Sequence, residues 1–369
     1  MLQILASDIA RIPDCLLEKK DPIVLYGAGN RGREIFAALR RSGHQVRAFI
    51  DRNARPGQQL HGIPVVPLKN ELGLHGLPVI ITVHNRDVNI QEIKNQLAAE
   101  KFDRVFSLVD VYDYFVKELG DKFWLTDRTY YLSREREIER GAGIWADEKS
   151  KNLYESVLQY RMTGNCAGLP SPDPGQYLPT DVPRWNEPVR LIDAGAYDGD
   201  TIRSFVESDY EIESIAAFEA DSANFSKLAE RVRSLQTKRP IRFVLLPCGI
   251  WSKTQAVSFD SGLGEASRLV DAKGHNGSYV QCVSIDDALQ NFDPTLIKMD
   301  IEGAEISALK GAAKTIRERR PGLAISVYHR PSDIWEIPFL VTEMVDGYSF
   351  YLRQHAHNCF DLIMYAIPS

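Results

Sequence analysis

The residues that point most directly to chemistry lie in the segment LIDAGAYDGDT, residues 191–201. Leu191 and Ile192 have the apolar character of a buried strand, and a turn of small and acidic residues follows them. Glycines let a backbone approach a ligand closely, and the next helix presents unpaired N–H groups at the same place. A second predicted strand leads into Glu219, 24 residues after Gly195. An acidic residue at this spacing hydrogen-bonds a ribose in doubly wound folds.

The acidic residues of this turn favour one class of ligand. The turn lacks the GxGxxG pattern of a dinucleotide site, and its acids would repel a pyrophosphate. They suit a ligand with a ribose, an amino group and a positive centre, so we expect S-adenosylmethionine rather than NAD. The alternative is an ordinary loop of a parallel sheet. The predicted cofactor-binding residues are Asp193, Gly195, Tyr197, Gly199, Asp200, Thr201, Glu219, Ala220, Gly249, Trp251 and Asp300.

A second group of candidates follows later predicted strands. LIKMD leads into IEGAEISALKGA, which places Asp300, Glu302 and Glu305 at the edge where open α/β sheets bind ligands. The strand GLAISVYH ends in His329, whose charge changes near neutral pH. We predict His329 and Asp300 as the catalytic residues, with His329 the preferred base and a structural role its alternative. The two glutamates are predicted to bind substrate, or else to favour a helix start through its dipole.

Three other features have two interpretations each. Trp251, after a third predicted strand, is expected either to contact the adenine or to fill the core. His355 and His357 lie on the turn between the last two predicted strands and are predicted as substrate contacts or rival bases. The proline- and glycine-rich segment 164–188 is either a linker or an ordered lid, from which Tyr177 could touch substrate. No metal-binding spacing is recognised, so no metal is predicted, although the carboxylates could bridge a hard cation to acceptor oxygens.

The N-terminal part contains a second strand–glycine unit. Gly27, Gly29 and Gly32 form a GxGxxG motif between a short apolar strand and an amphipathic helix. The next strand ends in Asp51, 24 residues after Gly27, which is the context of a nucleotide-binding βαβ unit. We expect NAD, another nucleotide or a nucleotide-sugar there, or else an interaction domain that retains the turn. No hydride-transfer constellation follows, so dehydrogenase chemistry is not expected.

Composition narrows the class of protein. The chain has 369 residues, of which 44% are hydrophobic and 25% charged, as in ordinary globular proteins of two domains. A net charge of −6 gives no basic field for nucleic acid or a membrane surface. The sequence has no apolar run of membrane-spanning length, an N-terminus that would make a poor signal peptide, and five scattered cysteines. We therefore expect a cytoplasmic protein with reduced thiols. We expect a Rossmann-like domain at 1–110, a helical linker with a loop at 111–185, and a catalytic domain at 186–369.

Six motifs together resemble the FkbM family of S-adenosylmethionine-dependent methyltransferases over roughly residues 186–368. They are DAGAYDGDT, FEAD, SIDDAL, IKMDIEGAEISALKGA, AISVYHRPSDIWEIP and MYAIP. The resemblance implies an α/β fold with a seven-stranded class I methyltransferase sheet. It also implies an enzyme that methylates a hydroxyl of a sugar, glycan or secondary metabolite. The first half is similar to the Rossmann-like domains at the front of some sugar-modifying acyltransferases.

The resemblance also implies roles for single residues. Asp193, Gly195, Asp200 and Glu219 would hold the cofactor, and Asp300 would lie near the reacting centre. The closing segment RQHAHNCF departs from the family pattern, because relatives often have a histidine directly after the arginine. That departure leaves the roles of the two closing histidines open.

The sequence therefore predicts an O-methyltransferase with an accessory Rossmann-like domain. The expected partner is a small-molecule or glycan substrate, with no nucleic acid, and a homodimer is one expected assembly. O-methylation follows from the resemblance and from the lack of an NPPY-type amide clamp. The alternative is a non-catalytic protein that binds a nucleotide or nucleotide-sugar, against which the retention of both cofactor acids and both glycines argues.

Overall fold

The computed structural model describes residues 12–70, 72–236, 240–260, 268–270 and 278–369. The chain divides into two compact units, each built from several segments. Unit 1 comprises Met1–Ala142, Asn152–Pro172 and Ala356–Phe360, and unit 2 comprises Gly143–Lys151, Asp173–His355 and Asp361–Ser369. Among the described residues, none of the helices has the length and apolar character needed to span a membrane.

Unit 1 is built around a six-stranded sheet of order β3-β4-β2-β1-β5-β6. Its strands are β1 (Ile23–Tyr26), β2 (Val46–Ile50), β3 (Gln59–Leu60), β4 (Ile63–Val66), β5 (Val79–Ile81) and β6 (Val105–Ser107). All neighbours are parallel except β3, which is antiparallel to β4. The predicted strands of the first βαβ unit and the two later ones are present, while the short hairpin of β3 and β4 was not predicted.

The helices of the first half of the chain lie before, between and after the strands of this sheet. They are α1 (Asp14–Glu18), α2 (Asn30–Arg41), α3 (Ile90–Ala99), α4 (Leu108–Leu119), α5 (Arg128–Leu132), α6 (Glu135–Ala142), α7 (Glu148–Thr163) and a 3₁₀ turn at Cys166–Gly168. The helical period of α2 buries Ile35, Phe36 and Leu39 on one face. Ser107 and Asp110 form a capping box that starts α4 directly after β6.

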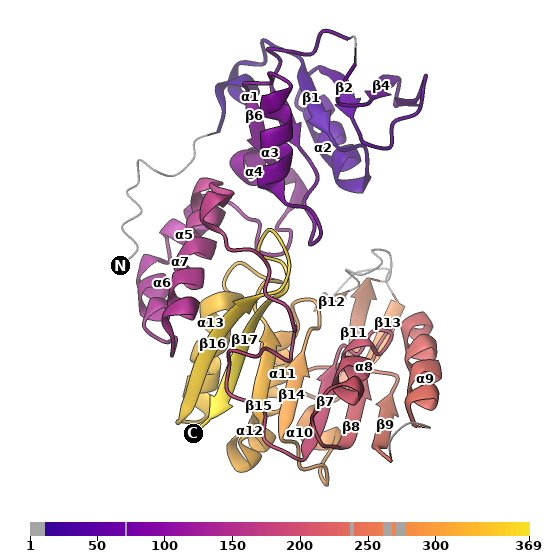
Figure 1. Ribbon diagram of the computed structural model, residues 1–369, viewed down its shortest axis with the longest axis vertical. Coiled ribbons are helices and arrows are strands. Elements are labelled where there is room, and N and C mark those ends of the chain that lie inside the picture. Colours follow the sequence, from indigo (N-terminus) through magenta and orange to yellow (C-terminus); the bar gives the residue numbers. More distant parts are fainter. Residues whose placement is uncertain (1–11, 71, 237–239, 261–267, 271–277) are drawn as a thin grey trace. The chain divides into compact units, whose positions relative to one another are not determined.

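Unit 2 contains the seven-stranded sheet that the sequence predicts. Its order is β16-β17-β15-β14-β7-β8-β9. The strands are β7 (Val189–Ala194), β8 (Ile212–Phe218), β9 (Arg242–Leu246), β14 (Leu296–Met299), β15 (Gly322–Ser326), β16 (Tyr348–Gln354) and β17 (Leu362–Pro368). The first five are parallel, and β17 is antiparallel to both β15 and β16. The prediction of a closing antiparallel pair is therefore confirmed, and the pair appears in yellow in Figure 1.

A smaller sheet and further helices complete the described part of unit 2. The small sheet has the order β10-β13-β11-β12, with β10 (Gly249–Ile250), β11 (Gln255–Asp260), β12 (Arg268–Val270) and β13 (Ser278–Val283). The helices are α8 (Asp200–Glu207), α9 (Ser222–Gln236), α10 (Ile285–Ala288), α11 (Glu305–Lys310), α12 (Ala313–Arg319) and α13 (Asp333–Met344). The central strands β7 and β14 are buried almost throughout, as expected of parallel strands covered on both faces.

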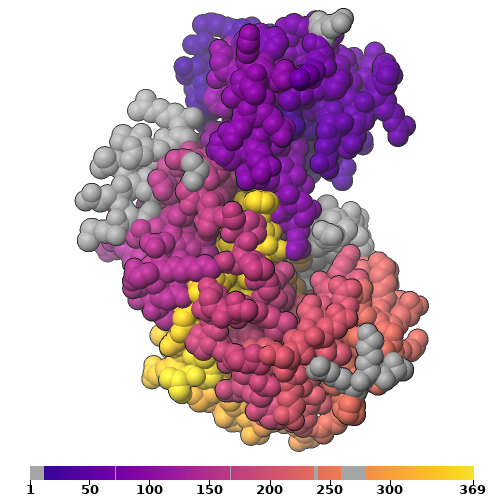
Figure 2. All heavy atoms as spheres, viewed as in Figure 1, coloured from indigo at the N-terminus to yellow at the C-terminus, as the bar shows by residue number. Residues whose placement is uncertain are grey.

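The segment 173–188, which precedes β7, is an ordered part of unit 2 without regular helix or strand. Its side chains Tyr177, Val182 and Trp185 are buried in the core of the unit. A Cβ atom on Gly322 would lie 2.7 Å from the Trp185 ring, so the glycine makes room for the indole. On the face shown in Figure 2, magenta residues of this part of the chain lie against the yellow closing strands. The segment thus brings its own side chains to the sheet.

Candidate functional site

A buried ion pair lies beneath the glycine turn after β7. Lys298 on β14 is the parallel neighbour of Asp193 on β7, and their charged groups are 2.9 Å apart. The ammonium group also donates to the carbonyl oxygen of Gly195 at 2.6 Å. Burial disfavours the charged lysine, but the charges of Asp193 and Asp300 outweigh it and raise the pKa of Lys298. A charged Lys298 therefore fixes both the strand end and the turn.

The glycine turn has a backbone that residues with a side chain rarely adopt. Gly195 has a φ of +79°, and a Cβ atom there would lie 2.0 Å from the carbonyl oxygen of Asp300. Gly199, with a φ of +86°, is the residue before α8, and its Cβ would lie 3.1 Å from the Leu228 side chain. Tyr197 between them is also left-handed, with a φ of +48°, and is exposed. The turn thus packs directly on the end of β14, beside Asp300.

Glu219 lies just after β8 and stabilises the same turn. Its two carboxylate oxygens accept hydrogen bonds from the backbone N–H of Tyr197 at 2.8 Å and of Asp221 at 2.7 Å. Burial raises the pKa of Glu219, and these two N–H groups partly offset that effect. Each oxygen keeps a second lone pair, which can accept from a ligand hydroxyl.

Asp300 is the acid at the end of β14. Its Oδ2 accepts a hydrogen bond from the hydroxyl of Tyr177 at 3.0 Å, and its Oδ1 lies 3.3 Å from Nε2 of His329. Burial alone would raise the pKa of Asp300, but the charges of His329 and Lys298 lower it below its ordinary value. Asp300 is therefore a carboxylate held by groups from three different parts of unit 2.

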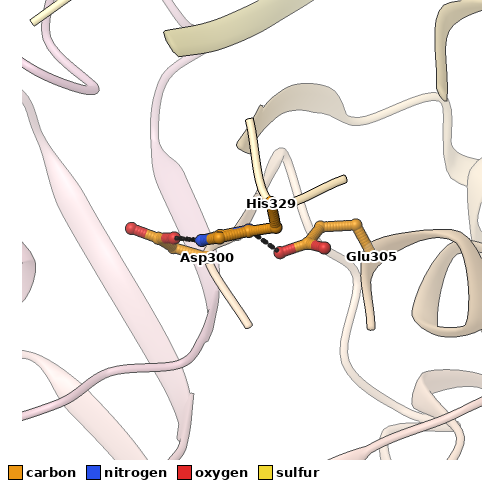
Figure 3. Close-up of side chains that lie close together, drawn as sticks. All are labelled: Asp300, Glu305 and His329. Carbon is orange, nitrogen blue, oxygen red and sulfur yellow. Dashed lines mark hydrogen bonds and ion pairs between the residues drawn. The ribbon is translucent and has the colours of Figure 1, made fainter. Parts of the chain in front are cut away.

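His329 follows β15 and lies between two carboxylates, as Figure 3 shows. Its Nδ1 is 2.8 Å from Oε1 of Glu305, and its Nε2 faces Asp300 and, at 3.7 Å, Glu302. Burial alone would lower the pKa of His329, but the charges of Glu305, Glu302 and Asp300 raise it to about 10. The side chain is 1% exposed. At neutral pH it is an imidazolium whose Nδ1 hydrogen-bonds Glu305 and whose Nε2 forms an ion pair with Asp300, which counts against the predicted role as a base.

Glu305 and Asp333 support this histidine from the buried side. Oε1 of Glu305 also accepts from the backbone N–H of Ile301 at 2.9 Å, which fixes the loop between β14 and α11. Asp333, at the start of α13, is 1% exposed and accepts from the backbone N–H of Arg330. Burial and the neighbouring Glu305 raise the pKa of Asp333 to about 8. Glu305 is itself 1% exposed. Its predicted contact with substrate stays a prediction, and its burial argues against that contact.

The described residues bring one group of possible metal ligands together. Ligand atoms of Asp300, Glu305 and His329 lie within 4.8 Å of one another. A histidine binds a metal through a deprotonated ring nitrogen, whereas both nitrogens of His329 face carboxylates. An imidazolium paired on both sides accounts for this geometry, and the absence of a metal stays a prediction.

Other predicted cofactor contacts lie in contrasting surroundings. Asp193 is wholly buried, which argues against a direct contact with a ligand. That contact stays a prediction. Asp200 begins α8 and is exposed, and its side chain accepts from the backbone N–H of Thr201. Gly249 lies on the short strand β10. Trp251 is 6% exposed and packs in a cluster of buried residues, which favours the core-filling interpretation.

The two closing histidines lie in different units. His355, in unit 2, has Nδ1 at 2.8 Å from the carbonyl oxygen of Asp173 and Nε2 at 2.8 Å from the Tyr365 hydroxyl. His357 belongs to unit 1, where its backbone N–H donates to the carbonyl of Arg86. Both ring nitrogens of His355 thus have partners within the protein, and substrate binding by either histidine stays a prediction.

The second glycine turn, in unit 1, repeats the arrangement of the first. Oδ2 of Asp51 accepts from the backbone N–H of Ala28 at 2.9 Å, as Glu219 does from Tyr197 in unit 2. A Cβ atom on Gly32 would lie 2.1 Å from the carbonyl oxygen of Gly27, so that glycine is required by packing. A Cβ atom on Gly29 would meet nothing within 4 Å.

Three residues of the unit 2 site were missed or underrated from sequence. Lys298 was not predicted, although a lysine within the apolar strand LIKMD is itself a signal, because a buried charge needs a partner. Asp333 was also missed, since acids at helix starts are common. Tyr177 was considered only as a possible substrate contact.

The strand order and the acidic edge of unit 2 define the class I methyltransferase fold. The crystal structure of methyltransferase FkbM from Methylobacillus flagellatus KT has the same fold over 98% of this chain and 95% of its own, with a TM-score of 0.80 and 21% identity. Fibrillarin from Aeropyrum pernix with natively bound S-adenosyl-L-methionine matches more weakly, with a TM-score of 0.31, 12% identity and coverage of 49% of this chain and 67% of that one. No curated protein matched the chain.

Residues 193–357 match the family described as the methyltransferase FkbM domain. This match and the shared fold support the resemblance to the FkbM family of S-adenosylmethionine-dependent methyltransferases that the motifs predict. The matched domain is that of a methyltransferase enzyme.

Proposed function

We propose that this enzyme transfers the methyl group of S-adenosylmethionine to a hydroxyl of a sugar, glycan or secondary metabolite. The observation that carries the proposal is the position of Asp300, an ionised acid at the carboxyl end of β14 beside the Gly195 turn. Ligands of open α/β sheets bind at this edge. A carboxylate there accepts a hydrogen bond from an acceptor hydroxyl and orients its oxygen toward the methyl group.

The residues around the first glycine turn fit the cofactor. The Glu219 carboxylate can accept from ribose hydroxyls, and Gly195 and Gly199 let the turn pack closely against the end of β14 and against Leu228. Asp200 and Tyr197 offer exposed groups at the same place. Asp193, which is buried against Lys298, supports the turn from beneath. When bound, the cofactor supplies an activated methyl group on a positively charged sulfur.

Asp300 is the better of the two predicted proton acceptors. A hydroxyl proton becomes strongly acidic as its oxygen gains a methyl group, so a carboxylate of low pKa is a sufficient base. His329, whose pKa is raised to about 10, already carries a proton at neutral pH. Its imidazolium instead holds Asp300 in place and stabilises the negative charge of that carboxylate.

The first test is calorimetric titration of the full chain with S-adenosylhomocysteine. We expect micromolar binding that Glu219→Ala abolishes. Glu213→Ala is the matched control, because Glu213 lies on β8, the strand directly before Glu219, but pairs with Arg190 and Arg242. Wild-type protein that binds NAD or a nucleotide-sugar but no S-adenosylhomocysteine would contradict the proposal. A panel of sugars and glycosides, with S-adenosylhomocysteine release as readout, then identifies the acceptor class.

We also propose that the glycine turn of unit 1 binds a nucleotide or nucleotide-sugar. Support comes from the open space above Gly29 and from the start of α2 at this position, where free N–H groups favour a phosphate. Gly29 has a φ of −75°, so Gly29→Ala keeps the backbone and places a methyl group where the phosphate would approach. Titration with NAD and nucleotide-sugars should therefore show binding to the wild type that Gly29→Ala weakens. An unchanged titration for this variant would place any such ligand elsewhere.

A further inference from the structure

Tyr177 has all of its polar groups engaged within unit 2. Its backbone N–H donates to the hydroxyl of Tyr365 at 3.0 Å, and its carbonyl accepts from Nε1 of Trp185 at 2.9 Å. Its own hydroxyl donates to Oδ2 of Asp300 at 3.0 Å. The ring also lies beside Lys298, with the ammonium nitrogen 5.4 Å from the ring centroid. A residue from an irregular segment is thus fixed against the end of β14.

The backbone of Tyr177 is in the left-handed region, with a φ of +67°. This conformation is unfavourable for a bulky residue, and such residues persist where the surroundings hold them. The three hydrogen bonds of Tyr177 supply that hold. Residues of this kind cluster at active sites, so the conformation directs attention to what the side chain does.

The hydrogen bonds that lead from the backbone N–H of Tyr177 through Tyr365 and His355 to a carbonyl all donate in the same direction. The carbonyl of Asp173 can only accept, so Nδ1 of His355 is the donor in that bond. Burial lowers the pKa of His355, which keeps the ring neutral, and its Nε2 therefore accepts from the Tyr365 hydroxyl. A lone pair of that hydroxyl is then directed at the N–H of Tyr177. His355 thus acts on Asp300 through Tyr365 and Tyr177.

The hydrogen bond that the Tyr177 hydroxyl donates orients the carboxylate of Asp300. Tyr177 holds Oδ2 while His329 faces Oδ1, and Ser326 and Lys298 also act on the carboxylate. Burial raises the pKa of the Tyr177 hydroxyl well above its ordinary value, so it remains a donor throughout the working pH range. A hydrogen bond to one oxygen and the ion pair with His329 at the other restrict rotation of the carboxylate, which leaves its remaining lone pairs in fixed directions.

We propose that Tyr177 is a positioning residue for methyl transfer, whose hydroxyl fixes the Asp300 carboxylate so that it receives the acceptor hydroxyl in one orientation. This inference rests on the proposed function of the same site. It assigns a role to the segment before β7, which lies outside residues 193–357.

The test compares Tyr177→Phe with Tyr348→Phe in the full chain. Tyr348 is the matched control, because its hydroxyl also donates a single hydrogen bond, to the carbonyl of Pro321. We expect Tyr177→Phe to lower kcat by roughly ten- to a hundredfold, the range for a hydrogen bond to a charged group, with S-adenosylhomocysteine affinity unchanged. Tyr365→Phe should lower kcat less, since it releases only the backbone of Tyr177. The control should keep wild-type values.

A second readout needs no acceptor. With ¹³C-labelled aspartate, the titration of the Asp300 carboxyl can be followed by NMR. Loss of the Tyr177 hydroxyl should raise the pKa of Asp300, because that bond favours its ionised form. Tyr348→Phe should leave the titration unchanged.

The outcomes separate this proposal from the function on which it rests. A kcat of Tyr177→Phe within twofold of wild type, or an Asp300 titration that does not move, overturns the positioning role. Failure of wild-type protein to bind S-adenosylhomocysteine overturns the proposed function, whatever the NMR shows. If no compound in the panel is methylated, the titration decides alone whether Tyr177 holds Asp300.

Discussion

At the scale of single residues, the proton on His329 depends on its two glutamate neighbours in unequal degree. Glu305 is buried and 2.8 Å from Nδ1, whereas Glu302 is partly exposed and 3.7 Å from Nε2. Coulomb interactions strengthen as water is excluded, so the buried partner should dominate. The protonation state of His329 can therefore be changed by substituting either glutamate with glutamine, which keeps the size of the side chain.

We expect Glu305→Gln to lower the pKa of His329 by about 1 to 3 units, because a nearby opposite charge is lost. Glu302→Gln should lower it by less. The measurement is the pH dependence of the His329 ring nitrogens in long-range ¹H–¹⁵N NMR spectra. Equal shifts in the two variants would show that distance and burial do not control the charge on this ring.

The raised pKa of His329 also makes a prediction about stability. The folded value, about 10, lies above the ordinary value of 6.5, so the stabilisation is fully present below pH 6.5 and is lost as pH rises through about 10. The free energy of unfolding of the wild type should exceed that of His329→Gln by a few kcal/mol below pH 6.5. Denaturant titrations across that range should show the difference shrinking toward pH 10, and a constant difference would exclude a charged His329.

The residues of this site were predictable to different degrees. Asp300 and His329 follow recognisable strands, and the carboxyl ends of parallel strands meet at one edge, so the sequence places them together. Tyr177 lies 123 residues before Asp300, and no local pattern shows that its segment reaches that edge. The charge state of His329 was also beyond prediction, because it depends on which nitrogen each carboxylate reaches.

At the scale of elements, Arg353 on β16 joins three parts of unit 2. Its guanidinium lies 2.7 Å from Asp147 before α7, 2.9 Å from Ser150 in α7 and 2.9 Å from Asp181 before β7. The arginine is 1% exposed. The strands themselves could be predicted from their apolar runs, but not this connection, since Arg353 and Asp147 are 206 residues apart.

We expect Arg353→Met to lower the free energy of unfolding by about 1.5–3 kcal/mol at neutral pH, because charged hydrogen bonds are lost while Asp147 and Asp181 stay partly exposed. Arg242→Met is the control, because its pair with Glu213 is exposed and worth little. Chemical denaturation of both variants measures the difference.

The same experiment at low pH should show a defined change in the stability difference between wild type and Arg353→Met. Despite partial burial, bonding with Arg353 lowers the pKa of Asp147, and Lys149 together with Arg353 lowers the pKa of Asp181. Their stabilisation is thus present above pH 3.8 and is lost as the pH falls through the lowered values. The gap between wild type and Arg353→Met should narrow there. A gap that persists unchanged in acid would assign the cost to lost packing alone.

At the scale of the whole molecule, the predicted start of the catalytic domain at residue 186 stays a prediction. The contacts of unit 2 argue for an earlier start. Trp185 packs on Gly322, Tyr177 holds Asp300, and Asp147 pairs with Arg353. Sequence motifs mark the residues that a family shares, whereas these supports lie in a segment whose proline- and glycine-rich composition resembles a linker.

The fragment 186–369 should therefore be much less stable than the full chain. It lacks the side chains that cover Gly322 and the partners of the buried Arg353. A loss of several kcal/mol lowers the melting temperature of a domain of this size by more than about 10 °C. The fragment 173–369 regains Tyr177, Asp181 and Trp185 and should melt between the two. If 186–369 instead unfolded cooperatively at the temperature of the full chain, the segment before β7 would be dispensable for folding, and its one remaining role would be the one proposed for Tyr177 at Asp300.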